Sequence, residues 1–267
     1  EALNEPIILD GPYSNSAFDI VCKNDKVYMI IGGKDLLNGK RFDKGGYILT
    51  YDYDKWSFID PKEAQKKLNL PRNPRDYTSI AVTTDDSNDE IVYASSMGDG
   101  VIQYKNGTPV QSYNEKNAFK ETAGGYGSGY CYIDGLAFDK NGNLWMTSSE
   151  VNHAVLVLDK AGAWHRLDIE QLRGVYTIND ILITSTNDKW IYVPRNTPKL
   201  VMIPNSESLD EVSSYEFTTL IDTDGKELTP SNYTCVAEDK DGYIWVGTNR
   251  GAVYFTKPRI SSAEDKA

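Results

Sequence analysis

Carboxylate side chains are the groups in this sequence whose positions suggest chemistry. Asp19, Asp134 and Asp180 each stand at the start of a short aliphatic stretch, in three similar segments. If these stretches are the inner strands of neighbouring sheets, the carboxylates meet around one opening, where they could bind a cation or act in acid-base chemistry. Carboxylates at such positions also stabilise turns by accepting backbone hydrogen bonds. We therefore treat all three as candidate ligand-binding residues and assign none to catalysis.

Basic residues are sparse but recur in the segments predicted to be loops. An arginine guanidinium offers a planar fork of donors that suits phosphate and carboxylate groups, so these residues could form a local anion site. Loop Lys and Arg are more often simply exposed to solvent, and we favour that interpretation. One tyrosine at the end of a glycine-rich loop completes the candidate ligand-binding set. Its members besides the aspartates are Arg41, Arg75, Tyr130, Arg195 and Arg250, with Lys34, Lys40 and Arg72 in or beside the same loops.

Other catalytic signatures are weak. The chain has two histidines, His153 in a predicted loop and His165 in a predicted outer strand, and a lone exposed histidine is seldom a general base. The DKNGN and DKDGY clusters begin like calcium loops but lack the downstream glutamate, so they predict tight turns. We find no nucleophile elbow, phosphate-binding loop or zinc spacing. The sequence predicts a non-enzymatic protein without metal or cofactor; a lyase or hydrolase using the three aspartates is the minority alternative.

The elements that would position these residues follow a repeat. Five times a polar turn is followed by an aliphatic residue, an aromatic residue, and then small or polar residues. The aromatics are Tyr28, Tyr93, Trp145, Tyr192 and Trp245, which lie 47 to 65 residues apart. This spacing fits one four-stranded blade of a β-propeller plus its connection. Each ring could bury about 150–250 Å² between neighbouring sheets, so all five are predicted to belong to the core.

Each repeat is predicted to contain two strands joined by a turn, a third strand and, in the first four repeats, a fourth. The fifth repeat has no fourth strand downstream, whereas the N-terminal PIILD stretch, residues 6–10, is a strand with no repeat of its own. We expect residues 6–10 to pair with the last blade and close the ring. The prediction is an all-β single-domain propeller over residues 1–258, followed over 259–267 by a polar tail that begins a linker to further domains.

One helix and several long connections interrupt the strands. The sequence DPKEAQKKLN from Asp60 combines an aspartate cap, a proline in the first turn and a capping-box glutamate. Long connections begin at Gly32, Tyr113 and Ile221, and in a propeller they emerge on the same face. Binding residues concentrate on loops that a rigid scaffold holds, so this face is the predicted functional face.

Composition restricts the partners. The net charge of -11 leaves no basic stripe for neutralising phosphates, so no nucleic-acid partner is expected. No apolar run approaches the ~18 residues of a membrane span. The three cysteines, Cys22, Cys131 and Cys235, are too few and odd in number for a complete disulfide framework. Cys22 and Cys235 are predicted to be small buried residues of inner strands.

Several stretches resemble known propeller families. GLAFDKNGNLWMTSS from Gly135 and CVAEDKDGYIWVGTNRGAVYF from Cys235 are similar to the repeats in the sensor halves of bacterial hybrid two-component regulators. A resemblance over most of the chain, to PorZ-like surface components of the type IX secretion system, rests on GPYSNSAFDIVCKNDKVYMIIGG, DYTSIAVTTDDSNDEIVYASSMGDGVIQYKNGTPVQSYNEKN and YIDGLAFDKNGNLWM. The second resemblance implies seven-bladed propellers that work with a sortase attaching cargo to anionic lipopolysaccharide. It supplies no ligand residues that can be transferred.

Two functions follow from these observations. The first is a non-enzymatic recognition or assembly module, exported to the periplasm or outer surface of a Gram-negative bacterium, whose long-loop face contacts a surface glycan or a secretion-system protein. The alternative is the ligand-sensing periplasmic domain of a hybrid two-component sensor kinase. Only the third and fifth repeats follow the regular sensor pattern closely, which favours the recognition module. The sequence leaves the oligomeric state open.

Overall fold

Antiparallel strands account for nearly all the regular structure of the computed structural model, which describes residues 11–36, 38–119, 129–210, 212–221 and 224–255. The strands of these residues are accompanied by one α-helix, α1 (Pro61–Leu68), and one turn of 3-10 helix, η1 (Glu170–Leu172). The predicted all-β class is therefore confirmed.

The first three predicted repeats each form a group of four antiparallel strands. Sheet one contains β1 (Ala17–Lys23), β2 (Lys26–Ile31), β3 (Ile48–Asp52) and β4 (Lys55–Ile59). Sheet two contains β5 (Tyr77–Thr84), β6 (Glu90–Gly98), β7 (Gly100–Lys105) and β8 (Thr108–Tyr113). Sheet three contains β9 (Cys131–Phe138), β10 (Leu144–Ser148), β11 (Val155–Leu158) and β12 (Trp164–Leu167). Sheets two and three are joined because the end of β6 pairs with the start of β9.

The last two repeats differ from each other in strand number. Sheet four contains β13 (Ile181–Ile183), β14 (Lys189–Val193), β15 (Lys199–Ile203) and β16 (Tyr215–Phe217). Sheet five contains β19 (Tyr233–Glu238), β20 (Ile244–Thr248) and β21 (Gly251–Phe255). The connection between them carries a small hairpin of β17 (Leu220–Ile221) and β18 (Glu227–Leu228), where the sequence predicted a loop.

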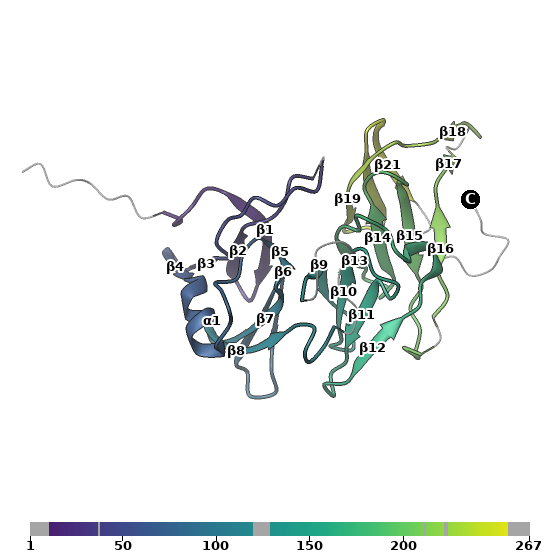
Figure 1. Ribbon diagram of the computed structural model, residues 1–267. Coiled ribbons are helices and arrows are strands. Elements are labelled where there is room, and N and C mark those ends of the chain that lie inside the picture. Colours follow the sequence, from purple (N-terminus) through teal and green to yellow (C-terminus); the bar gives the residue numbers. More distant parts are fainter. Residues whose placement is uncertain (1–10, 37, 120–128, 211, 222–223, 256–267) are drawn as a thin grey trace, which may run out of the picture.

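The described residues do not test the predicted closure of the ring. The predicted closing strand, residues 6–10, and the predicted tail, residues 259–267, both lie outside them. Figure 1 shows the sheets following one another along the molecule, with sheet one in the left half and sheet five in the right half. No strand pairing joins these two sheets among the described residues.

The predicted helix is present between sheets one and two. Pro61 occupies the first turn of α1, and the Asp60 carboxylate caps the helix by accepting a 2.9 Å hydrogen bond from the Lys62 amide. A capping box would instead direct this carboxylate to the Glu63 amide, which donates to the Asp60 backbone carbonyl at 3.0 Å. The helix ends at Asn69, whose φ of 51° lies in the left-handed region.

Apolar clusters fill the spaces between successive sheets. Four of the five repeat aromatics lie in these clusters, each packed toward the following sheet: Tyr28 is 2% exposed, Tyr93 8%, Trp145 1% and Tyr192 7%. Burying each ring stabilises the fold by several kcal/mol, at about 25 cal/mol per Å². The core assignment is confirmed for these four.

The fifth aromatic does not follow the prediction. Trp245 is 41% exposed because no sheet of the described residues packs on its side of sheet five. The prediction that Cys22 and Cys235 are buried is also wrong, since both are exposed and only Cys131 is buried. These cysteines lie on the outward faces of sheets one and five, on which no other sheet of the described residues packs.

The aspartates of the two turn clusters stabilise tight turns. Asp139 accepts hydrogen bonds from the amides of Asn141 and Asn143, both at 2.9 Å. Its second oxygen accepts the indole N–H of Trp145 at 2.9 Å. Asp239 makes the same contact with Trp245 at 2.7 Å. Each cluster therefore fixes both a turn and the orientation of the tryptophan that follows it.

Candidate functional site

The connections between sheets emerge at the same end of the strands as the β2–β3 loop of sheet one, as predicted. We call this end, which includes the connections 32–47, 60–76 and 168–180, the loop face. Most of the predicted site residues lie on or beside it. The connection predicted from Tyr113 to Tyr130 also belongs to this end, but its residues 120–128 lie outside the described chain.

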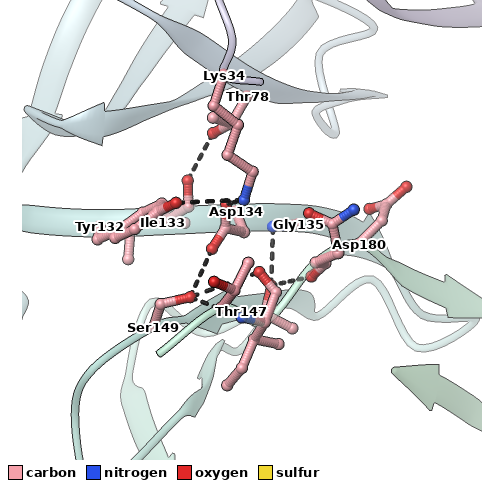
Figure 2. A network of polar contacts seen from close by, with 12 residues as sticks. Lys34, Thr78, Tyr132, Ile133, Asp134, Gly135, Thr147, Ser149 and Asp180 are labelled. Atoms are coloured by element: carbon pink, nitrogen blue, oxygen red, sulfur yellow. Dashed lines mark hydrogen bonds and ion pairs between the residues drawn. The ribbon is translucent and has the colours of Figure 1, made fainter. Parts of the chain in front are cut away.

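A buried ion pair lies beneath the loop face. Lys34, from the loop after β2, extends across to Asp134 on β9 of sheet three, and both side chains are 2% exposed. The Lys34 ammonium also lies 5.1 Å from the centre of the Tyr132 ring. Figure 2 shows Lys34 pointing at Asp134 between two β-sheets. The first loop of the chain is thus anchored to a sheet that is not its neighbour.

The second oxygen of Asp134 is also bonded. It accepts the Ser149 hydroxyl at 2.8 Å, and Ser149 accepts the Ile178 amide at 2.8 Å (Figure 2). Burial raises the pKa of Asp134, and the Lys34 charge and the Ser149 hydroxyl oppose that rise. A charge pair so enclosed stabilises the fold only while both partners remain. We interpret Asp134 as an architectural residue because Lys34 binds one of its carboxylate oxygens and Ser149 the other.

Asp180 is placed differently. It precedes β13, is exposed to solvent, and accepts its neighbour Ile181's amide at 2.8 Å. Dense surrounding protein, followed by the charges of Asp19 and Asp134, raises the pKa of Asp180 to about 7. A Cβ atom on Gly135 would lie 2.9 Å from an Asp180 carboxylate oxygen, so sheets three and four meet closely here. Asp180 is the accessible carboxylate of the predicted trio.

Asp19 joins sheet one to sheet two. It lies within β1 and accepts the Ser79 hydroxyl at 3.2 Å and the Ile80 amide at 3.1 Å. Burial raises the pKa of Asp19, and these hydrogen bonds oppose the rise. The charge of Asp19 contributes to the raised pKa of Asp180.

Arg195 connects the same first loop to sheet four. Its guanidinium donates to the Leu36 carbonyl and, at 3.3 Å, to the Thr177 hydroxyl. A Cβ atom on Gly39 would lie 2.4 Å from the guanidinium, and the φ of Gly39 is 72°, so only glycine suits this position. In this arrangement Arg195 holds a loop in place. Its positive charge also acts to lower the pKa of Asp134.

Arg41 and Arg75 form a second group on the loop face. Arg41 Nε lies 3.1 Å from Asp76 and 3.0 Å from Asp43, and Arg75 lies 3.9 Å from Asp43. Tyr130 lies beside Arg41; burial raises the Tyr130 pKa, and the arginine charge partly offsets this. Both arginines are therefore next to carboxylates, which reduces the positive charge that an anionic ligand would meet.

Arg250 and His165 make their contacts with other residues. Arg250 is exposed at the β20–β21 turn, where its backbone amide donates to Thr248 at 3.0 Å. His165 on β12 lies 2.9 Å from Asp159 at the outer edge of sheet three, which agrees with the predicted outer strand. Among the described residues no cluster of three or more His, Cys, Asp or Glu side chains has the geometry for a metal ion.

Sequence reasoning missed three residues of this site. Lys34 was noted only as a loop charge, although it is the buried partner of Asp134. Asp76, which is 0% exposed and bonds Arg41 and the Lys44 amide, and Ser149 were not singled out. Nothing in the local sequence marks these residues, because their partners come from distant segments.

Polar contacts also join the inner strands of successive sheets. Thr78 of β5 donates to the Ile133 carbonyl of β9 at 2.6 Å, and Thr147 of β10 donates to the Asn179 carbonyl at 2.8 Å. Thr147 in turn accepts the Gly135 amide at 2.8 Å, as Figure 2 shows. The loop face is therefore supported by a rigid base of interlocked strands.

Comparison with known proteins supports the predicted resemblances. The family model described as two component regulator propeller matches residues 227–250. These residues include the DKDGY turn, Trp245 and the turn between β20 and β21. No curated protein matches the sequence. No helix of the described residues is both long and apolar enough to span a membrane.

Solved structures show the same fold. PorZ of Porphyromonas gingivalis, a surface component of the type IX secretion system, superposes with a TM-score of 0.78 at 20% identity over 94% of this chain, which spans 34% of PorZ. The extracellular domain of a hybrid two-component system of B. thetaiotaomicron gives 0.56 at 16% identity, with 90% and 28% of the two chains covered. Virginiamycin B lyase of Staphylococcus aureus gives 0.55 at 15% identity, covering 92% and 71%. These similarities establish a β-propeller fold.

Proposed function

We propose that this chain is a non-enzymatic β-propeller module, exported to the periplasm or outer surface of a Gram-negative bacterium, that recognises a glycan or a partner protein through its loop face. The proposal rests mainly on one observation. Loops from different sheets come together at the loop face, above inner strands that are hydrogen-bonded to one another. Lys34 and Arg195 fix the first loop to sheets three and four. Loops held in this way present side chains in defined positions, as recognition requires.

The chemistry of the loop face favours a ligand rich in hydroxyl groups. Asp180 is an exposed acceptor, Arg75 and Arg250 are exposed donors, and Tyr176 is 51% exposed on the 168–180 connection. Hydroxyl groups both donate and accept hydrogen bonds, so they match such a mixed surface. A strongly anionic ligand is less favoured, because Arg41 and Arg75 lie beside carboxylates and the chain carries a net charge of -11.

The PorZ resemblance supports the assembly role. PorZ is described as an essential surface component of the type IX secretion system, so a secretion-system protein is the partner that this similarity suggests. The superposition with a lyase is a similarity of fold alone, and two of the three aspartates considered for catalysis are bonded to other groups of the protein. Asp134 is bonded to Lys34 and Asp19 to sheet two.

The test is a binding screen of the protein against neutral and acidic bacterial glycans, with and without calcium. Saturable binding should fall at least about tenfold in Asp180→Asn, because each lost charge-assisted hydrogen bond contributes about 1.5–3 kcal/mol. The double variant Arg195→Gln, Arg250→Gln tests the anion site. Lys240→Gln, at the exposed β19–β20 turn on the opposite end of the strands, is the matched control and should bind normally.

The outcomes separate the ligand classes. Loss of acidic-glycan binding in the arginine double variant, with neutral-glycan binding retained, would support an anion site, and unchanged binding would refute it. Binding that Asp180→Asn and the arginine variant both leave intact would overturn the loop-face assignment. Absence of binding to every glycan would leave a partner protein as the ligand, to be sought by crosslinking from the loop face in the native cell.

The regulator-propeller match at residues 227–250 favours a second candidate, the ligand-sensing periplasmic domain of a hybrid two-component sensor kinase. In that role ligand binding would change the association of two copies of the domain. Sedimentation with and without the glycan identified above distinguishes the two. A ligand-dependent dimer supports the sensor, whereas binding without any change in association supports the recognition module.

A further inference from the structure

A cavity of about 250 Å³ opens between sheets one and two, at the end of the strands opposite the loop face. The hairpin turns β1–β2, β3–β4 and β5–β6 surround it. We call it the turn cavity, and its polar lining includes Asn24, Lys26, Asp52, Thr84, Asn88 and Glu90. Clefts of about 300–1,000 Å³ hold drug-sized ligands, so the turn cavity suits a smaller ligand, close to the size of one sugar ring.

The floor of the turn cavity is a bonded group of three side chains. Glu90 Oε2 accepts the Lys26 ammonium at 2.7 Å and also accepts the Tyr28 hydroxyl. The Lys26 ammonium lies 4.9 Å from the centre of the Tyr28 ring. Tyr28 is 2% exposed and packs in the apolar cluster between the two sheets. The core therefore fixes the floor, and Lys26, the basic residue of the lining, is already paired.

Polar side chains above this floor have no hydrogen-bond partner among the described residues, namely Asn24, Asp52, Thr84 and Asn88. Sheet four provides the comparison, because Asn187 precedes an Asp-Lys pair at the start of a strand, as Asn24 does. Asn187 accepts the Lys140 amide at 2.9 Å and donates to Asn205 at 2.9 Å. The turns of sheets three and four are thus bonded directly, whereas the cavity separates those of sheets one and two.

The lining favours a neutral ligand that carries hydroxyl groups. An anion would meet the carboxylates of Asp52 and Glu90, and a cation would meet the Lys26 ammonium. Asparagine amides donate and accept hydrogen bonds and carboxylates accept them, and hydroxyl groups complement both. Tyr53 also lines the cavity and is 81% exposed, so its ring offers an apolar face to the C–H groups of a sugar.

We propose that the turn cavity is a second binding site, which takes a neutral, hydroxyl-rich ring such as one sugar unit. Asp52 and the amides of Asn24 and Asn88 bond the ring hydroxyls, and Tyr53 packs on the face of the ring. The site lies at the opposite end of the strands from the loop face. It therefore does not rest on the function proposed for that face.

The probes are four neutral monosaccharides (glucose, galactose, mannose and N-acetylglucosamine) with glucuronic acid and glucosamine as charged counterparts. Two-dimensional amide NMR of the 267-residue chain should show saturable shifts at Thr83, Thr84 and Asn88 with a neutral sugar, and weaker binding of the charged counterparts. Shifts at Tyr176 and Thr177 report on the loop face separately, so each site can fail alone. No saturable shift at the cavity with any neutral sugar, or tighter binding of a charged counterpart, overturns the proposal.

Variants identify the groups that bind. Asp52→Asn should weaken sugar binding about fivefold or more, because charge-assisted hydrogen bonds become neutral ones. Tyr53→Asn removes the ring, and asparagine tolerates the φ of 40° at this position; binding should fall about threefold or more. Both residues are exposed, so the unfolding temperature should stay within about 2 °C.

Asp25→Asn is the matched control. Asp25 is exposed on the β1–β2 turn, has a φ of 59°, and is not one of the residues lining the cavity. The substitution changes the charge as Asp52→Asn does, and sugar binding should be unaltered. Equal binding by Asp52→Asn, Tyr53→Asn and the unaltered protein overturns the proposal. An equal loss in Asp25→Asn and Asp52→Asn overturns it as well, because the effect would then be one of net charge.

Discussion

At the scale of single residues, the chain uses its charges mainly to fix loops. Lys34 and Asp134 are both removed from water and form an ion pair with each other. The charged Arg195 guanidinium instead donates to two uncharged acceptors, a carbonyl and a hydroxyl. Because Lys34 and Asp134 lie 100 residues apart, their pairing fixes the first loop against a sheet formed much later in the sequence.

Removing Lys34 should destabilise the protein strongly. Lys34→Met leaves the Asp134 carboxylate buried without its partner, which is expected to lower the free energy of unfolding by about 3–5 kcal/mol. Lys44→Met, at an exposed lysine of the same loop, should change it by less than about 0.5 kcal/mol. Urea denaturation followed by tryptophan fluorescence measures both, and a loss below about 1 kcal/mol for Lys34→Met would contradict the buried pair.

Asp180 should make stability fall as pH rises. Its pKa is about 7 in the folded state against a usual 3.8, so the folded state binds the proton more tightly. The contribution of this group is therefore complete below about pH 4 and is lost as pH rises through 7. Urea denaturation at pH 5 and pH 8 should show a smaller decline for Asp180→Asn than for the unaltered protein. Equal declines would show that the carboxyl titrates normally.

At the scale of elements, the two tryptophan-bearing hairpins separate the effect of burial from that of local structure. Trp145→Ala should cost about 3–5 kcal/mol, the usual range for a fully buried aromatic. Trp245→Ala removes the equivalent aspartate contact, but the lost ring is 41% exposed. The loss in free energy of unfolding of the 267-residue chain should therefore be clearly smaller. Thermal and urea unfolding of the two variants provide the comparison. Equal losses would mean that Trp245 is covered in solution.

At the scale of the whole molecule, stability should decrease from the middle of the arc toward its ends. β9 and β10 have packed sheets on both sides, whereas sheets one and five each have one outward face. Native-state hydrogen exchange of the 267-residue chain should therefore be fastest, among sheet amides, in β1 and in β19–β21. Uniform protection across all sheets would indicate that the end faces are covered within these residues.

The amino-acid sequence by itself determined the fold class, the strand groups, the helix and the turns. These features depend on neighbouring residues: alternation of apolar side chains, Asn-Gly and Asp-Gly pairs, and an aspartate followed by proline. The spacing of Tyr28, Tyr93, Trp145 and Tyr192 was also sufficient to place them in the core. The sequence predicted the position of Asp134 and Asp180 near one end of the inner strands, but not the different environments of the two carboxyls.

Only the tertiary structure decided which of these groups are buried and which remain available. Asp134 is enclosed because Lys34 and Ser149 arrive from other sheets, and Asp180 is left exposed beside it. Trp145 and Trp245 share their local sequence, yet a neighbouring sheet covers one and not the other. Burial and charge pairing depend on segments that are distant in the sequence. A local pattern therefore determines that a strand forms, but not which residues pack against it.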